Sequence, residues 1–152
     1  MKRPPRRFDR RMMGRAFQLA RLNQGLTGKN PSVGCILVDP LGLIVGAGVT
    51  GAGGRPHAEE IALEEAAGRA RGGTAYVTLE PCRERSTGTP SCSSKLVDAG
   101  IARVVVAIED PHPTAKDGLA VLRDAGVRVE TGLGKQAAAR LYAWFFAAAQ
   151  KA

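Results

Sequence analysis

Long hydrophobic runs are missing from this sequence, and aromatic residues are scarce. No apolar stretch approaches the roughly 18 residues that a membrane-spanning helix requires, so the pattern excludes a helical membrane protein. Only 5% of the 152 residues are aromatic, which leaves few side chains on which nucleic-acid bases could stack. The N-terminus is basic, but the apolar segment of a signal peptide does not follow it. We therefore expect a cytoplasmic protein that does not associate with membranes.

Cysteine is also scarce, with one residue at each of positions 35, 82 and 92. An odd number of cysteines in a chain without a secretory signal does not suit a disulfide framework. Metal binding or burial is the better expectation for each thiol. Cys35 lies in an apolar segment, and we interpret it as a small buried side chain. Cys82 and Cys92 lie at the ends of a polar loop and are candidate metal ligands.

The rest of the composition is that of a folded domain with unevenly placed charge. Hydrophobic residues make up 44% and charged residues 24%, with a formal net charge of +8, and the length suffices for one domain with a real core. Six Lys and Arg residues fall within the first eleven positions. We predict a solvated basic tail over residues 1–8 and one folded domain over residues 9–150. A nucleic-acid-binding arm is the alternative, which the lack of interleaved aromatic residues disfavours.

Helical and strand-like segments alternate along the chain, separated by turns rich in glycine and proline. Asp9 is predicted to cap a first helix that extends to about Asn23. Two hairpin strands follow, and the later alternation of strands and helices requires right-handed crossovers and largely parallel pairing. The predicted fold class is α/β, a three-layer α/β/α sandwich around a five-stranded mixed sheet. The expected strands cover residues 33–38, 44–49, 75–79, 104–108 and 127–131, and the expected helices cover residues 9–23, 58–70, 91–99, 118–125 and 135–149.

A glycine-rich run from Gly46 to Gly51 formally matches a dinucleotide-binding fingerprint. That motif requires a helix to open directly from the glycines, whereas here more glycine and Pro56 follow. We interpret the run as a flexible loop rather than a cofactor site.

Three potential metal ligands fall at the boundaries of predicted elements. His57 precedes the second helix, Cys82 follows the third strand and Cys92 opens the third helix. Helix N-termini favour the thiolate form of cysteine, and one imidazole with two thiolates leaves a fourth zinc position open for water. We predict a Zn²⁺ site at these three residues. A closed structural zinc site, the alternative, usually takes four ligands, and the second histidine, His112, is expected in a surface loop.

Glu59 lies two residues after His57, on the first turn of the predicted helix. At that spacing its carboxylate points near the metal without being forced to coordinate it. A carboxylate there can take a proton from a zinc-bound water and pass it to a substrate. Glu59 is therefore the predicted catalytic residue.

With these residues the sequence resembles the cytidine deaminase-like superfamily, and most closely the deaminase domain of riboflavin biosynthesis, diaminohydroxyphosphoribosylaminopyrimidine deaminase. The order His-x-Glu, Pro-Cys and a further Cys is the signature of zinc deaminases. The resemblance covers about residues 13–146 and implies release of ammonia from an aminopyrimidine, a substrate contact at Asn30, and a homo-oligomer (dimer or tetramer). It also suggests a separate reductase in the same pathway. The segments that carry it are Asn30-Pro31-Ser32-Val33-Gly34-Cys35, Pro56-His57-Ala58-Glu59, residues 75–82 and residues 99–106.

The sequence departs from the riboflavin-type pattern in loops near the substrate. The loop between the two cysteines is one residue longer than usual and lacks the family's histidine, and Gly88 stands where a phosphate-binding cation would be. A second family histidine is Thr50 here. Two alternatives stay open: the same chemistry on another nucleobase, nucleoside or secondary-metabolite heterocycle, and a basic nucleic-acid-binding module with a structural zinc. Two arginines of the loop, Arg83 and Arg85, could replace the missing cation. Together with Asn30 and Thr50, which the resemblance implies, they are the predicted substrate-binding residues.

Overall fold

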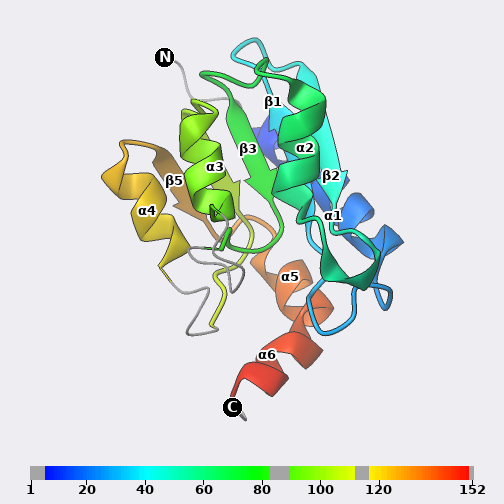
Figure 1. Cartoon of the computed structure of the whole chain (residues 1–152). Coiled ribbons are helices and arrows are strands. Elements are labelled where there is room, and N and C mark those ends of the chain that lie inside the picture. Colours follow the sequence, from blue (N-terminus) through cyan, green and yellow to red (C-terminus); the bar gives the residue numbers. More distant parts are fainter. Residues whose placement is uncertain (1–5, 83–89, 112–116, 151–152) are drawn as a thin grey trace.

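The computed structural model of the chain describes residues 6–82, 90–111 and 117–150. Within them the predicted order of helices and strands is confirmed (Figure 1), with most elements a few residues shorter and the last helix divided at Tyr142. The helices are α1 (Arg6–Leu22), α2 (Ala58–Ala66), α3 (Cys92–Asp98), α4 (Gly118–Asp124), α5 (Lys135–Leu141) and α6 (Ala143–Gln150), with a 3₁₀ turn η1 at Ala52–Gly54. The strands are β1 (Gly34–Val38), β2 (Ile44–Val49), β3 (Thr74–Val77), β4 (Arg103–Val106) and β5 (Arg128–Thr131).

The five strands form one mixed sheet in the order β2-β1-β3-β4-β5. Strand β1 is antiparallel to both of its neighbours, whereas β3, β4 and β5 are parallel. Helices α2, α3 and α4 cover one face, and α1 and α5 lie on the other (Figure 1). The predicted three-layer α/β/α sandwich is confirmed. The carboxyl ends of the parallel strands point to one edge, where ligands bind in open sheets of this kind.

Alternate residues of each strand build two hydrophobic clusters, one on each face of the sheet. On β1, Cys35 and Leu37 pack with α2 and α3, while Ile36 and Val38 pack with α1. This division follows from the two-residue period of a strand, and burial on both faces explains the continuous apolar runs. Cys35 is fully buried, which confirms the interpretation of its thiol as a core side chain.

The start of the first helix differs from the prediction. Helix α1 begins at Arg6, so residues 6–8 are helical, and Asp9 lies inside the helix instead of capping it. Asp9 is buried, and its two oxygens accept hydrogen bonds from the Arg103 guanidinium at 3.0 and 2.6 Å and from the Tyr76 hydroxyl at 2.6 Å. Arg103 also pairs with Glu130 at 2.9 Å. Because buried charges need partners, this network fixes α1 against β3 and β4.

The interpretation of the glycine-rich run as a flexible loop is wrong for residues 46–49, which belong to β2, where the sequence also predicts a strand over residues 44–49. Gly46 and Gly48 lie in β2, and a Cβ at either position would come 2.2 Å from a carbonyl oxygen of α2. Only glycine lets the two backbones approach so closely. The glycines therefore seat α2 directly on the sheet, with His57 at its N-terminus.

Candidate metal centre and active site

The three predicted metal ligands converge near the carboxyl end of β3. His57 is the N-cap residue of α2, Cys92 is the first residue of α3, and Cys82 follows β3 by five residues. The His57 Nδ1 atom lies 3.2 Å from Cys92 Sγ and 3.9 Å from Cys82 Sγ. All three donor atoms fall within 4.8 Å of one another, and no other such group of three occurs among the described residues.

The N-terminus of α3 stabilises negative charge on Cys82. The Cys92 N–H donates to Cys82 Sγ at 3.3 Å, and the Ser93 N–H donates to the Cys82 carbonyl at 3.2 Å. The hydrogen bond from the Cys92 thiol, helped by His57 and against the effect of burial, lowers the pKa of Cys82 to about 4. The pKa of Cys92 is raised in turn, because Cys92 holds the proton that the two sulfurs share. A divalent cation would displace that proton.

The donor set fits zinc. One imidazole nitrogen and two thiolate sulfurs are ligands that Zn²⁺ prefers, whereas Mg²⁺ and Ca²⁺ prefer oxygen. Three protein ligands leave one tetrahedral position for water or substrate, as in catalytic rather than structural zinc sites. Cys35 does not join the group, since it is buried in the core beneath α2.

Glu59 is a buried carboxyl beside this donor set but not one of its members. The side chain is 4% exposed. Burial, assisted by the negative charge of Cys82, raises the pKa of Glu59 to about 7, although its own backbone N–H and His57 act in the opposite direction. A carboxyl with a pKa near neutrality can both accept and return a proton at physiological pH.

Glu60 and Lys95 hold the two ligand-bearing helices together, and the sequence analysis missed both. The Glu60 carboxylate accepts the backbone N–H of His57 at 3.1 Å and pairs with Lys95 of α3 at 2.8 Å. The three-residue spacing from His57 to Glu60 is that of a capping box, a signal that could have identified Glu60. The pairing with Lys95 joins residues 35 apart and has no local signal.

Two predicted substrate-binding residues, Asn30 and Thr50, lie on neighbouring segments. The Asn30 Nδ2 donates to the Gly54 carbonyl at 3.3 Å. Thr50 is buried, and its Oγ1 accepts the N–H of Val33 at 2.9 Å. The hydroxyl of Thr50 therefore already orders the segment before β1. Three other residues of the sequence analysis lie outside the described residues: Arg83, Arg85 and His112.

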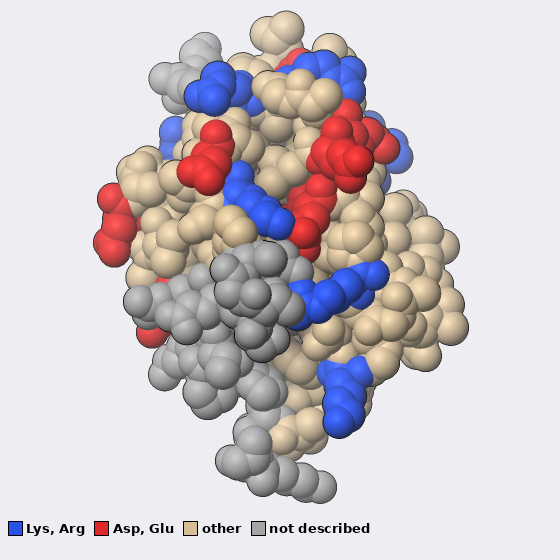
Figure 2. All heavy atoms as spheres, viewed as in Figure 1, with Lys and Arg blue, Asp and Glu red and all other residues tan. Residues whose placement is uncertain are grey.

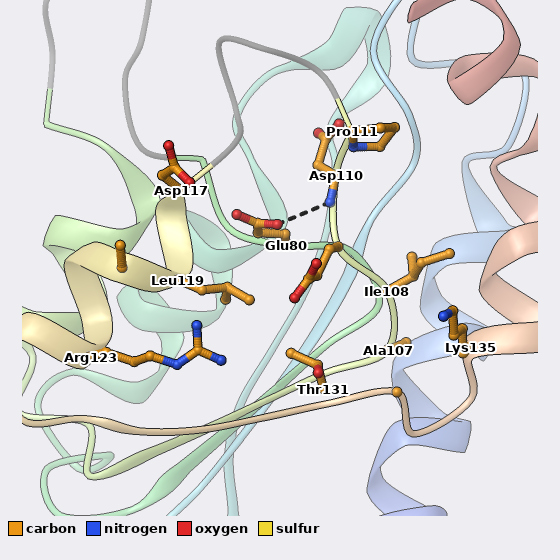
Figure 3. Close-up of a pocket in the computed structure, with 13 residues that line it drawn as sticks. Glu80, Ala107, Ile108, Asp110, Pro111, Asp117, Leu119, Arg123, Thr131 and Lys135 are labelled. Carbon is orange, nitrogen blue, oxygen red and sulfur yellow. Dashed lines mark hydrogen bonds between the residues drawn. The ribbon is translucent and has the colours of Figure 1, made fainter. Parts of the chain in front are cut away.

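A cavity of about 620 Å³ opens at the carboxyl ends of β4 and β5 (Figure 3). Arg123 of α4 projects toward it from one side, and Glu80 and Asp110 lie at the other. The Glu80 carboxylate accepts the N–H of Asp110 at 3.1 Å, which ties the segment after β3 to the segment after β4, and burial raises the pKa of Glu80. No member of the metal centre lines this cavity, whose walls carry charges of both signs.

The surface over α2 and α3 mixes charges of both signs. In Figure 2, Lys and Arg side chains among the described residues of this face are separated by acidic and uncharged ones. A continuous basic stripe of the kind that follows a nucleic-acid backbone is therefore not formed by the described part of this face. In the described residues, none of the helices has the length and apolar character needed to cross a membrane.

An open α/β sheet, a His/Cys/Cys group at its carboxyl edge and a buried glutamate two residues after the histidine together define the class of zinc deaminases. The chain belongs to the family described as the cytidine and deoxycytidylate deaminase zinc-binding region, which matches residues 6–108.

Known relatives confirm the resemblance to deaminases of riboflavin biosynthesis. The chain is 48% identical over 122 residues to the riboflavin biosynthesis protein RibD of Haemophilus influenzae, covering 80% of this chain and 32% of that protein. It is 44% identical over 122 residues to the diaminohydroxyphosphoribosylamino-pyrimidine deaminase of Buchnera aphidicola, covering 80% of this chain and 82% of that protein. The chain thus spans about a third of the RibD relative and most of the Buchnera one.

A solved structure from Thermotoga maritima shows the same fold. It is a diaminohydroxyphosphoribosylaminopyrimidine deaminase/5-amino-6-(5-phosphoribosylamino)uracil reductase, 33% identical to this chain, with a TM-score of 0.89. The match covers 95% of this chain and 42% of that protein. The similarity therefore extends through the whole sheet and both helical layers.

Proposed function

We propose that this chain is a zinc-dependent hydrolytic deaminase that releases ammonia from diaminohydroxyphosphoribosylaminopyrimidine, an intermediate of riboflavin biosynthesis. The observation that carries the proposal is the convergence of His57, Cys82 and Cys92 beside the buried carboxyl of Glu59. The choice of substrate is supported by the Buchnera deaminase, most of whose length the chain matches.

In this proposal His57, Cys82 and Cys92 hold the zinc ion. When bound, zinc acts as a Lewis acid and lowers the pKa of a coordinated water toward 7. Glu59, with its pKa near 7, would accept one proton of the attacking water and pass it to the ring nitrogen, then take the second proton from the newly added hydroxyl and pass it to the leaving amine. The reaction consumes one water, replaces a ring C–NH₂ by C=O and releases ammonia.

Two variants separate proton transfer from metal binding. Glu59→Gln keeps the shape of the side chain and should retain one zinc per chain by elemental analysis while losing ammonia release at least a hundredfold, the usual contribution of acid–base catalysis. His57→Ala should lose the zinc as well. A structural zinc in a nucleic-acid-binding module predicts instead that Glu59→Gln changes nothing measurable, so full turnover by this variant would reject the catalytic assignment.

We further propose that Asn30, Thr50, Arg83 and Arg85 contact the substrate. Ammonia release should be compared between the phosphorylated aminopyrimidine and its unphosphorylated counterpart. If the arginines replace the missing cation, the double change of Arg83 and Arg85 to Ala raises KM for the phosphorylated compound only. The double change of Arg128 and Arg140 to Ala, both exposed, is the matched loss of two positive charges. Turnover of unphosphorylated rings alone would favour the second candidate function, deamination of another heterocycle. This candidate is motivated by Gly88, which stands where a phosphate-binding cation would be.

We also propose that the enzyme is a dimer or tetramer and acts in the cytoplasm, where reducing conditions preserve two thiolate ligands. A separate reductase of the same pathway remains a prediction. Trp144 of α6 is 46% exposed, and large aromatic side chains of this kind are enriched at subunit interfaces. Sedimentation analysis of the protein and of Trp144→Arg should show a smaller assembly for the variant, and an unchanged assembly would exclude α6 from the interface.

A further inference from the structure

Tyr142 connects the junction of α5 and α6 to two other segments, the one that enters β1 and the one that leaves β3. It lies between α5 and α6 and is 1% exposed. Its hydroxyl is 2.8 Å from the carbonyl oxygen of Ser32 and 2.6 Å from Oγ1 of Thr78. Three parts of the chain that are far apart in sequence therefore meet at one buried hydroxyl.

Counting protons fixes the direction of these hydrogen bonds. The Ser32 carbonyl can only accept, so the single Tyr142 proton goes to it. Thr78 must then donate its own proton to the Tyr142 oxygen, and Thr78 Oγ1 in turn accepts the N–H of Gly34 at 3.1 Å. The chain begins at Gly34 N–H and ends at Ser32 C=O, two residues away on the same segment. Every donor in it has an acceptor.

The same segment is also held from its other edge. The N–H of Val33 donates to Thr50 Oγ1 at 2.9 Å, and the N–H of Thr50 donates to the Val33 carbonyl at 3.0 Å. The peptide group between Ser32 and Val33 is thus bound through its C=O by Tyr142 and through its N–H by Thr50. With both polar groups satisfied inside the protein, this peptide group has one orientation.

This fixed peptide group is linked to two of the proposed substrate contacts. Asn30, a proposed substrate contact, precedes Ser32 by two residues. Thr50, a second proposed contact, is bonded to Val33 directly. Burial raises the pKa of Tyr142, and the negative charge of Glu59 raises it further, which indicates that the phenol lies within the field of the catalytic carboxyl.

We propose that Tyr142 is a positioning residue for substrate binding: acting with Thr78, it fixes the Ser32–Val33 peptide group and thereby the segments that carry Asn30 and Thr50. The inference rests on the proposed function, because it takes those two side chains as substrate contacts. The hydrogen bonds of the Tyr142 hydroxyl go to Thr78 and Ser32 and not to a proposed metal ligand.

Tyr142→Phe removes the hydroxyl and keeps the ring. The zinc content should stay at one per chain, kcat should change by less than about twofold, and KM should rise about tenfold, the effect of a buried polar group losing its partner and loosening the segment. Tyr76→Phe is the matched control, because it also deletes a buried tyrosine hydroxyl. That hydroxyl donates to Asp9 at a distance of 2.6 Å, in the network around Arg103. Tyr76→Phe should destabilise the protein without changing KM. Equal KM values for Tyr142→Phe and the wild type would overturn the proposal.

A second pair of variants keeps the test decisive if Tyr142→Phe does not fold. Thr78→Val removes the hydroxyl that links Gly34 to Tyr142 and should raise KM. Thr78→Ser keeps that hydroxyl, and its KM should equal that of the wild type. Amide hydrogen exchange at Val33 and Gly34 should accelerate in Tyr142→Phe or Thr78→Val but not in Tyr76→Phe. If the wild type released no ammonia, the proposed function would fail, while the exchange rates would still show whether Tyr142 fixes this segment. Unchanged exchange in the variants would reject the positioning role by itself.

Discussion

Replacing Glu59 by glutamine should remove the contribution of this carboxyl from the pH dependence of the stability of the zinc-free protein. In the fold the pKa of Glu59 is raised from 4.5 to about 7, chiefly by burial. The folded state therefore holds this proton more tightly than the unfolded state does. Between pH 4.5 and 7 the unfolded chain releases the proton first, so the contribution of Glu59 to the free energy of unfolding falls as the pH rises through this window and levels off above it.

The size of the effect follows from the gap between the two pKa values, which corresponds to about 3 kcal/mol. Glutamine does not titrate, so the difference in unfolding free energy between wild type and Glu59→Gln should shift by about this amount, in favour of the variant, from pH 4.5 to pH 8. Because Cys82 titrates in both proteins, its contribution largely cancels in the comparison. Urea denaturation of chelator-treated protein at a series of pH values measures the difference.

The matched control is Glu64→Gln, an exposed change on the same helix, which should leave the pH dependence as it is. Adding zinc should weaken the slope of the wild type, because a nearby cation favours the ionised carboxylate. Parallel curves for zinc-free wild type and Glu59→Gln would show that this carboxyl is solvated and ionised. That result would refute the argument that burial prepares Glu59 to carry a proton near pH 7.

Three further changes test the packing and the ligand set. Asp9→Asn should cost about 1.5–3 kcal/mol in urea denaturation because it removes one of the two carboxylates that pair with the buried guanidinium of Arg103, while zinc content stays unchanged. Gly34→Ala should prevent stable folding, since its Cβ would lie 1.8 Å from a carbonyl oxygen of α1. A Cβ at Gly14 would have no heavy atom within 4 Å, so Gly14→Ala should instead raise the free energy of unfolding by up to about 1 kcal/mol. Cys35→Ala should keep one zinc per chain, and loss of the metal would contradict the three-ligand assignment.

The sequence was sufficient for the order of the elements and for the residues that meet at the edge of the sheet. Apolar alternation and turn residues marked the strands, and the ligand candidates stood at element boundaries that parallel topology brings together. What the sequence could not supply were contacts between distant residues. Asp9 has the identity of a helix cap, yet Arg103, 94 positions away, holds it within α1. Gly46 and Gly48 fall in the predicted strand over residues 44–49, but the reason for glycine at these positions, the close approach of α2, exists only in the packed fold.

Two groups of polar residues in the described part of the chain lie at opposite ends of the parallel strands and have different consequences. Around Arg103, which opens β4, the partners Asp9, Tyr76 and Glu130 pair within one network, so this network can stabilise the fold. At the opposite, carboxyl end of the parallel strands lie the metal ligands and the hydrogen-bond chain through Thr78. Because the two groups lie at opposite ends of the parallel strands, substitutions in them should have different effects. A substitution at Asp9 should change the free energy of unfolding and leave KM unchanged, whereas a substitution at Thr78 should change KM.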